Sequence, residues 1–158
     1  RSVAIAASGF GDRARIGAGT VLEAAHVDAL LAAGGTLVVT PNVRPAVIRR
    51  AVGLGLQVVA GFATTSEAFD ALEAGAPMLK LFPAAVYGPA MVRALRSVLP
   101  PVPLFAVGGV TPDTLPVYLS AGCQGVGIGG ELYRPGQSAE HTRTQARRFR
   151  EAWMEHTA

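Results

Sequence analysis

The sequence predicts an α/β fold with a parallel sheet, and two patterns support this prediction. Short apolar runs alternate with helical stretches rich in Ala and Leu, and a Gly or Pro follows or closes each run. The runs are apolar on both faces, which is typical of strands that helices cover on each side. The six runs expected to form strands are residues 14–19, 36–40, 56–60, 78–82, 103–107 and 123–128.

The residues that begin and end helices support this alternation. Residues 2–7 resemble the end of a helix that precedes the first strand. Thr64 and Glu67 have the spacing of a capping box, and Ser138 can cap the last helix. Thr111 followed by Pro112 predicts a cap and the first helical residue of the helix between the last two strands. The expected helix ends are Gly34 with Gly35, Gly55, Gly75, Pro100 and Gly122.

The ends of the six expected strands carry unusual residues, and this favours one architecture. A doubly wound sheet gathers its ligands at one switch point, whereas a (β/α)8 barrel uses the carboxyl ends of most strands. We therefore expect residues 1–158 to form a single TIM-barrel domain with about six of its eight units. On this interpretation the N-terminal part of the barrel precedes Arg1. The strand-end residues are Gly19, Thr20, Pro41, Asn42, Gly61, Lys80, Gly108, Gly109, Gly129 and Gly130.

Composition and charge argue against several other classes of protein. Half of the 158 residues are hydrophobic and 16% are charged, as in a folded globular protein. No apolar stretch is long enough to cross a membrane. The net charge is +3, but the sequence has no recognised nucleic-acid-binding motif, which argues against that class. The three histidines lack the spacing of metal ligands, so we expect no metal and no cofactor. A single cysteine, Cys123, cannot form an internal disulfide, and this favours the cytoplasm.

Lys80 is the main candidate for a catalytic residue. Thirteen of the fourteen basic residues are arginine, and this one lysine lies among apolar residues in an expected strand. Burial favours the neutral amine, which can attack a carbonyl carbon and form a Schiff base. The alternative is a structural lysine on an edge strand whose ammonium reaches solvent or an acidic partner.

Two glycine pairs, Gly108–Gly109 and Gly129–Gly130, follow the last two expected strands. Backbone N–H groups in such loops can bind phosphate, as the loops after the last strands of barrels often do. The alternative is that both pairs serve only to form tight turns.

Read together, several motifs closely resemble the class I aldolases that act on keto-deoxy-phosphogluconate and keto-deoxy-phosphogalactonate. The resemblance runs from about Ile16 to the end, and it is most specific around Lys80. The Val-Thr-Pro-Asn motif is more similar to the phosphogalactonate branch. The motifs are Gly17-Ala-Gly-Thr-Val21, Val39-Thr-Pro-Asn42, Thr65-Ser-Glu-Ala-Phe69, Leu79-Lys-Leu-Phe-Pro-Ala84, Val107-Gly-Gly-Val110 and Leu132-Tyr-Arg-Pro-Gly136.

The resemblance implies a homotrimeric (β/α)8 barrel that cleaves 2-dehydro-3-deoxy-6-phosphogalactonate, or its gluconate epimer, to pyruvate and D-glyceraldehyde 3-phosphate. Lys80 would form the imine with the substrate ketone. Thr20, Pro41 and Phe82 would line the keto-acid pocket. Backbone amides of Gly108, Gly109, Gly129 and Gly130 would hold the phosphate.

The chain also departs from the family pattern. Gly130 stands where the family often has Ser, and the family's catalytic Glu and a carboxylate-binding Arg would lie before Arg1. We therefore expect weak or no aldolase activity if the chain is the whole molecule. The alternatives are another phosphate-binding barrel enzyme, similar to thiamine-phosphate synthase, and a non-catalytic phosphosugar-binding fragment.

Overall fold

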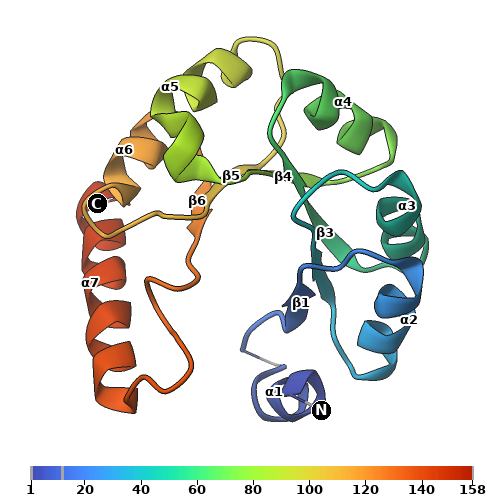
Figure 1. Cartoon of the computed structure of the whole chain (residues 1–158), viewed down its shortest axis with the longest axis horizontal. Helices are drawn as coiled ribbons and strands as arrows, with labels where there is room; N and C mark the ends of the chain where they lie inside the picture. The colour runs from blue at the N-terminus through green and yellow to red at the C-terminus, as the bar shows by residue number, and fades with distance from the viewer. Residues whose placement is uncertain (1, 12, 158) are drawn as a thin grey trace. The chain divides into compact units, whose positions relative to one another are not determined.

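The computed structural model describes residues 2–11 and 13–157, and it confirms the α/β prediction (Figure 1). Within these residues, six strands alternate with seven helices. Contacts between Cα atoms divide the chain into two compact units, of which the first ends at Lys80 and the second begins at Leu81. We call these unit 1 and unit 2 and describe each separately.

Unit 1 contains four strands, each preceded by a helix, and β1, β2, β3 and β4 are neighbours in this order. The first three strands are parallel, and their register aligns Ala18 with Val38 and Val38 with Val58. The elements are α1 (Ser2–Phe10), β1 (Gly17–Gly19), α2 (Ala24–Ala32), β2 (Leu37–Val39), α3 (Pro45–Gly53), β3 (Gln57–Phe62), α4 (Thr65–Glu73) and β4 (Met78–Leu81).

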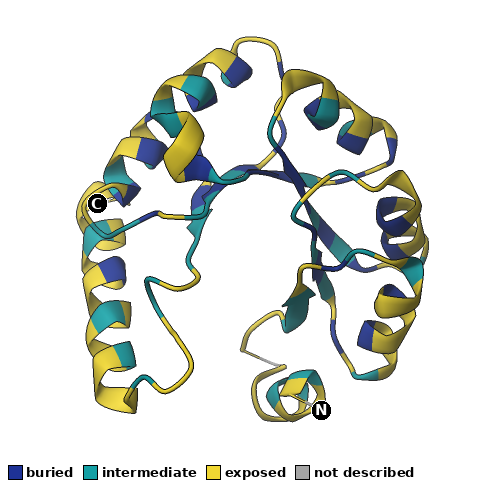
Figure 2. Cartoon of the chain, viewed as in Figure 1, coloured by how far each residue is buried: buried dark blue, intermediate teal, exposed yellow. Residues whose placement is uncertain are grey.

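The core of unit 1 lies between its strands and the helices beside them (Figure 2). Val38 and Val58 lie in register on adjacent strands and are fully buried. Helix α3 buries Val47, Ile48 and Ala51, which fall on one face at helical spacing. This packing holds the strands parallel, so that their carboxyl ends lie at one edge of the sheet.

Unit 2 contains β5 and β6, which pair in parallel with Phe105 opposite Gly125. Helix α5 is interrupted at Gly88, where φ is +71°, and Pro89 follows. Phe149 is the buried residue of the long last helix. The elements are α5 (Ala84–Arg96), β5 (Leu104–Val107), α6 (Leu115–Ser120), β6 (Gly125–Gly127) and α7 (Ala139–Thr157).

All six strands fall within or next to the predicted apolar runs, and two of the predicted helix caps are confirmed. The Thr64 hydroxyl accepts a hydrogen bond from the Glu67 N–H at 3.3 Å, and the Glu67 carboxylate accepts one from the Thr64 N–H at 2.9 Å. The Ser138 hydroxyl accepts from the His141 N–H at 3.1 Å. No helix in the described residues is long and apolar enough to cross a membrane.

Helix α6 begins at Leu115, later than predicted, but Thr111 makes the hydrogen bonds of the predicted cap in the turn before it. The Thr114 N–H donates to the Thr111 hydroxyl at 3.3 Å, and the Leu115 N–H donates to the Thr111 carbonyl at 2.9 Å. The Thr111 N–H donates to the Thr114 hydroxyl at 2.9 Å, and the Thr114 N–H donates to the Thr111 carbonyl at 3.2 Å. Thr111 therefore caps a turn that leads into α6, and Pro112 is the first residue of that turn.

Candidate active site

Lys80 is buried in β4, with only 6% of its surface exposed, between Leu79 and Leu81, which are fully buried. Successive side chains on a strand point to opposite faces, so the lysine faces away from its two leucine neighbours. Burial lowers the pKa of the Lys80 amine because the charged form loses hydration. The structure therefore gives this lysine a greater fraction of nucleophilic neutral amine than an exposed lysine has.

Thr20 follows β1 directly and has a backbone conformation that is rare for its residue type. Its φ is +57°, in the left-handed region that disfavours β-branched side chains. Such strain costs about 1–3 kcal/mol and is often found at functional sites. The geometry at Thr20 is therefore consistent with a residue retained for a purpose other than stability.

Pro41 lies just beyond β2, and the structure shows how its position is set. The Thr40 hydroxyl is fully buried and accepts a hydrogen bond from the Gly61 N–H at 3.1 Å. A Cβ atom at Gly61 would lie 2.5 Å from the Thr40 carbonyl oxygen and 2.6 Å from the Pro41 carbonyl. Only glycine permits this close approach of the two strand ends.

Thr40 is a residue that sequence reasoning missed. A hydroxyl residue that ends an apolar run just before a proline was the available signal. Its partner, however, is 21 residues away in the sequence, and no local pattern identifies it.

In unit 2, the Gly108–Gly109 pair packs directly against the segment that follows β4, residues 82–85. A Cβ atom at Gly108 would lie 3.1 Å from the Phe82 ring, and one at Gly109 would lie 2.6 Å from the Ala85 Cβ. The Ala85 N–H also donates to the Gly108 carbonyl at 3.0 Å. Both glycines have positive φ values, +96° and +74°. Their lack of a side chain is therefore required by the packing of this segment.

Tyr118 also holds the 82–85 segment, and the sequence did not identify it. Its hydroxyl, from the buried side of α6, donates to the Ala84 carbonyl at 2.8 Å. Burial raises the pKa of the Tyr118 phenol, so that it remains a protonated donor. The segment is thus fixed by a side-chain bond on one side and by the glycine pair on the other.

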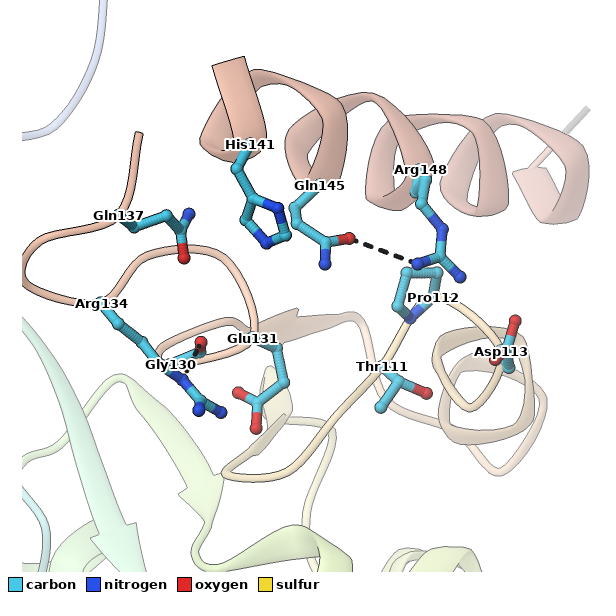
Figure 3. A pocket seen from close by; sticks show the side chains of 10 residues that line it. All are labelled: Thr111, Pro112, Asp113, Gly130, Glu131, Arg134, Gln137, His141, Gln145 and Arg148. Atoms are coloured by element: carbon cyan, nitrogen blue, oxygen red, sulfur yellow. Dashed lines mark hydrogen bonds between the residues drawn. The ribbon is translucent and has the colours of Figure 1, made fainter. Parts of the chain in front are cut away.

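The Gly129–Gly130 pair after β6 has open surroundings. A Cβ atom at Gly129 would meet no described atom within 4 Å, and neither glycine has a positive φ. In the part of the chain that the structure describes, the N–H groups of this pair donate no hydrogen bond. Gly130 lines a cavity of about 400 Å³, whose other walls come from α7 and from the turn at Thr111 (Figure 3). These N–H groups are therefore available to an anionic ligand.

The structure thus brings the predicted residues together in two sets. Thr20, Pro41 and Lys80 lie at or near the carboxyl ends of strands β1, β2 and β4 in unit 1. Phe82 and Gly108 are in contact in unit 2, where the second glycine pair follows β6, the strand next to β5. Cys123 is buried, and burial raises the pKa of its thiol to about 11. It is therefore a protonated core residue.

A parallel α/β fold with a buried lysine near a strand end is the arrangement expected of an enzyme in which a lysine amine attacks a substrate carbonyl. The sequence model of the family described as KDPG and KHG aldolase matches residues 6–145. The chain belongs to this aldolase family, as the motifs predicted.

Two relatives and one solved structure illustrate this membership. The chain is 52% identical over 156 residues to 2-dehydro-3-deoxy-6-phosphogalactonate aldolase of Escherichia coli. The aligned residues cover 98% of this chain and 76% of that protein. It is 47% identical to the probable enzyme of the same name from Rhizobium meliloti, over 83% of this chain and 62% of that protein. A solved structure described as native KDPGal has a TM-score of 0.97 and 52% identity, covering 99% of this chain and 76% of that chain.

Proposed function

We propose that the protein is a class I aldolase that cleaves 2-dehydro-3-deoxy-6-phosphogalactonate to pyruvate and D-glyceraldehyde 3-phosphate. The observation that carries the proposal is Lys80, a buried lysine of lowered pKa in strand β4. The names of the two relatives, which are 52% and 47% identical to the chain, support the phosphogalactonate substrate.

In the proposed reaction, the neutral Lys80 amine attacks the C2 ketone, and the resulting carbinolamine loses water to form an iminium ion. A base removes the proton of the C4 hydroxyl, and the C3–C4 bond breaks to release the aldehyde. The electron pair of that bond moves into the iminium to form an enamine. Protonation at C3 and hydrolysis then release pyruvate and restore the lysine.

We assign the keto-acid end of the substrate to Thr20, Pro41 and Phe82. The strained backbone of Thr20 and the hydrogen-bonded strand end before Pro41 support this assignment. We assign the phosphate to the backbone N–H groups of Gly108, Gly109, Gly129 and Gly130, none of which donates a hydrogen bond within the described residues.

The architecture and setting of the whole protein are also proposals. We infer a single-domain (β/α)8 barrel that forms a homotrimer, on the resemblance to the aldolase family and on the parallel strands of each unit. The single free cysteine, buried in unit 2, supports a cytoplasmic location.

Borohydride reduction in the presence of pyruvate tests the proposal. The reduced imine is expected as a covalent adduct on the peptide that contains Lys80, detected by mass analysis. The Lys80→Met variant, which keeps an unbranched side chain in an apolar site, is expected to fold and to give no adduct. Absence of the adduct in the unaltered chain, or its persistence in the variant, would contradict the lysine mechanism.

Turnover distinguishes the remaining candidates. An adduct without cleavage of substrate would favour a phosphosugar-binding role for the chain. If cleavage occurs, kcat/KM for the galactonate and gluconate epimers identifies the preferred substrate. We expect the galactonate epimer to be preferred, because relatives of that name are 52% and 47% identical.

A further inference from the structure

We propose that Arg134 binds the phosphate group of the substrate beside Gly129 and Gly130. The inference rests on the proposed function, which places a phosphate at this loop. A phosphate monoester carries about 1.5–2 negative charges at neutral pH. Backbone N–H groups supply only partial charges, so a cation at the loop would add the stronger interaction.

The guanidinium of Arg134 is held next to Gly130. Its Nε donates to the Gly130 carbonyl at 2.9 Å, and a Cβ atom at Gly130 would lie 3.4 Å from Nε and 3.9 Å from Nη2. The two Nη groups donate no hydrogen bond within the described residues, and no described carboxylate lies within 4.0 Å of them. The Nη groups therefore present an unused fork of donors, which matches the oxygen atoms of a phosphate.

The loop that carries Arg134 is folded by its own hydrogen bonds. The Leu132 and Tyr133 N–H groups both donate to the Gly129 carbonyl, at 2.9 and 3.1 Å. The Gln137 N–H donates to the Arg134 carbonyl at 3.0 Å, and the Gln137 side chain donates to the Leu132 carbonyl at 2.8 Å. The arginine is thus positioned without a ligand, which lowers the entropic cost of binding one.

The cavity of about 400 Å³ beside this loop provides the space for a ligand group (Figure 3). Gly130, Glu131 and Arg134 line one wall, while the α7 side chains and the turn at Thr111 line the others. Arg148, the second arginine on the cavity, comes from α7 and donates to Gln145 at 3.4 Å. Arg134 is therefore the cavity arginine that is bonded to the glycine pair.

The test compares aldol addition of pyruvate to D-glyceraldehyde 3-phosphate and to unphosphorylated D-glyceraldehyde. Arg134→Ala is expected to lower kcat/KM for the phosphorylated aldehyde about 10- to 100-fold, as for a lost charge-assisted hydrogen bond. The value for D-glyceraldehyde should change less than about twofold, and Arg134→Lys should be intermediate because it keeps only a point charge. Arg147→Ala removes the same charge from α7 outside the cavity, and it is the matched control.

The proposal would be overturned if Arg134→Ala preferred the phosphorylated aldehyde as strongly as the unaltered chain does. It would also be overturned if Arg147→Ala lowered kcat/KM for D-glyceraldehyde 3-phosphate as much as Arg134→Ala does. Pyruvate trapping at Lys80 distinguishes failure of the Arg134 proposal from failure of the proposed function, because trapping should be normal in Arg134→Ala. If the unaltered chain traps no pyruvate, the proposed function fails instead.

In that case, phosphate binding is measured by NMR titration with glycerol 3-phosphate at the Gly129 and Gly130 amides. Binding that depends on Arg134 supports the inference, and absent or Arg134-independent binding overturns it.

Discussion

In unit 2, the neighbouring parallel strands β5 and β6 both lead into a Gly-Gly pair, but other residues enclose only the first pair. Gly108 and Gly109 have positive φ values and press against residues 82–85. Gly129 and Gly130 have no positive φ and do not press against that segment, and Gly130 lines the cavity beside Arg134. The same dipeptide therefore meets a packing requirement after β5 and leaves open backbone donors after β6.

The largest expected effect is from Gly109→Ala. Its Cβ atom would lie 2.6 Å from the Ala85 Cβ, and the residue would have to keep a φ of +74°. Left-handed backbone strain and overpacking together should lower the free energy of unfolding by about 3 kcal/mol. Urea denaturation measures this loss. A cost below about 0.5 kcal/mol would show that the first pair is not needed for packing.

Tyr118→Phe tests whether the 82–85 segment needs the Tyr118 hydrogen bond in addition to its packing against Gly108 and Gly109. The change removes the 2.8 Å hydrogen bond to the Ala84 carbonyl, which is the side-chain bond between α6 and this segment. We expect a loss of about 0.5–1.5 kcal/mol in the free energy of unfolding. Because the segment begins two residues after Lys80, pyruvate trapping should also slow. Val117→Ala, on the exposed side of the same helix, is the control and should change trapping little.

These contacts show where sequence reasoning is sufficient and where it is not. Buried parallel strands leave a local signal, because each apolar run is continuous and ends at a turn residue, and Lys80 is conspicuous among such residues. The two glycine pairs have no local difference that reveals their roles. What distinguishes them is a segment about 25 residues earlier that packs against one pair alone. Thr40 and Tyr118 were missed for the same reason, since their partners are 21 and 34 residues away.

Thr20→Gly extends the comparison to unit 1. Thr20 shares a positive φ with Gly108 but keeps a side chain that this conformation disfavours. Glycine should relieve the strain, and after its greater loss of entropy on folding the net gain is roughly 0.5–1 kcal/mol. If the threonine side chain serves the substrate, kcat/KM should fall while stability rises. A loss of both, measured by urea denaturation and aldol kinetics, would indicate a structural role.

Gly129→Ala should have the smallest effect on stability and is the matched counterpart of Gly109→Ala. A methyl group at Gly129 meets no described atom within 4 Å, and the backbone there does not require glycine, so the free energy of unfolding should change by less than about 0.5 kcal/mol. The methyl group would instead occupy space beside the free N–H groups, where the phosphate is proposed to bind. We therefore expect KM for D-glyceraldehyde 3-phosphate to rise severalfold, with KM for pyruvate unchanged. Loss of stability without a change in KM would place the second pair in the same structural class as the first.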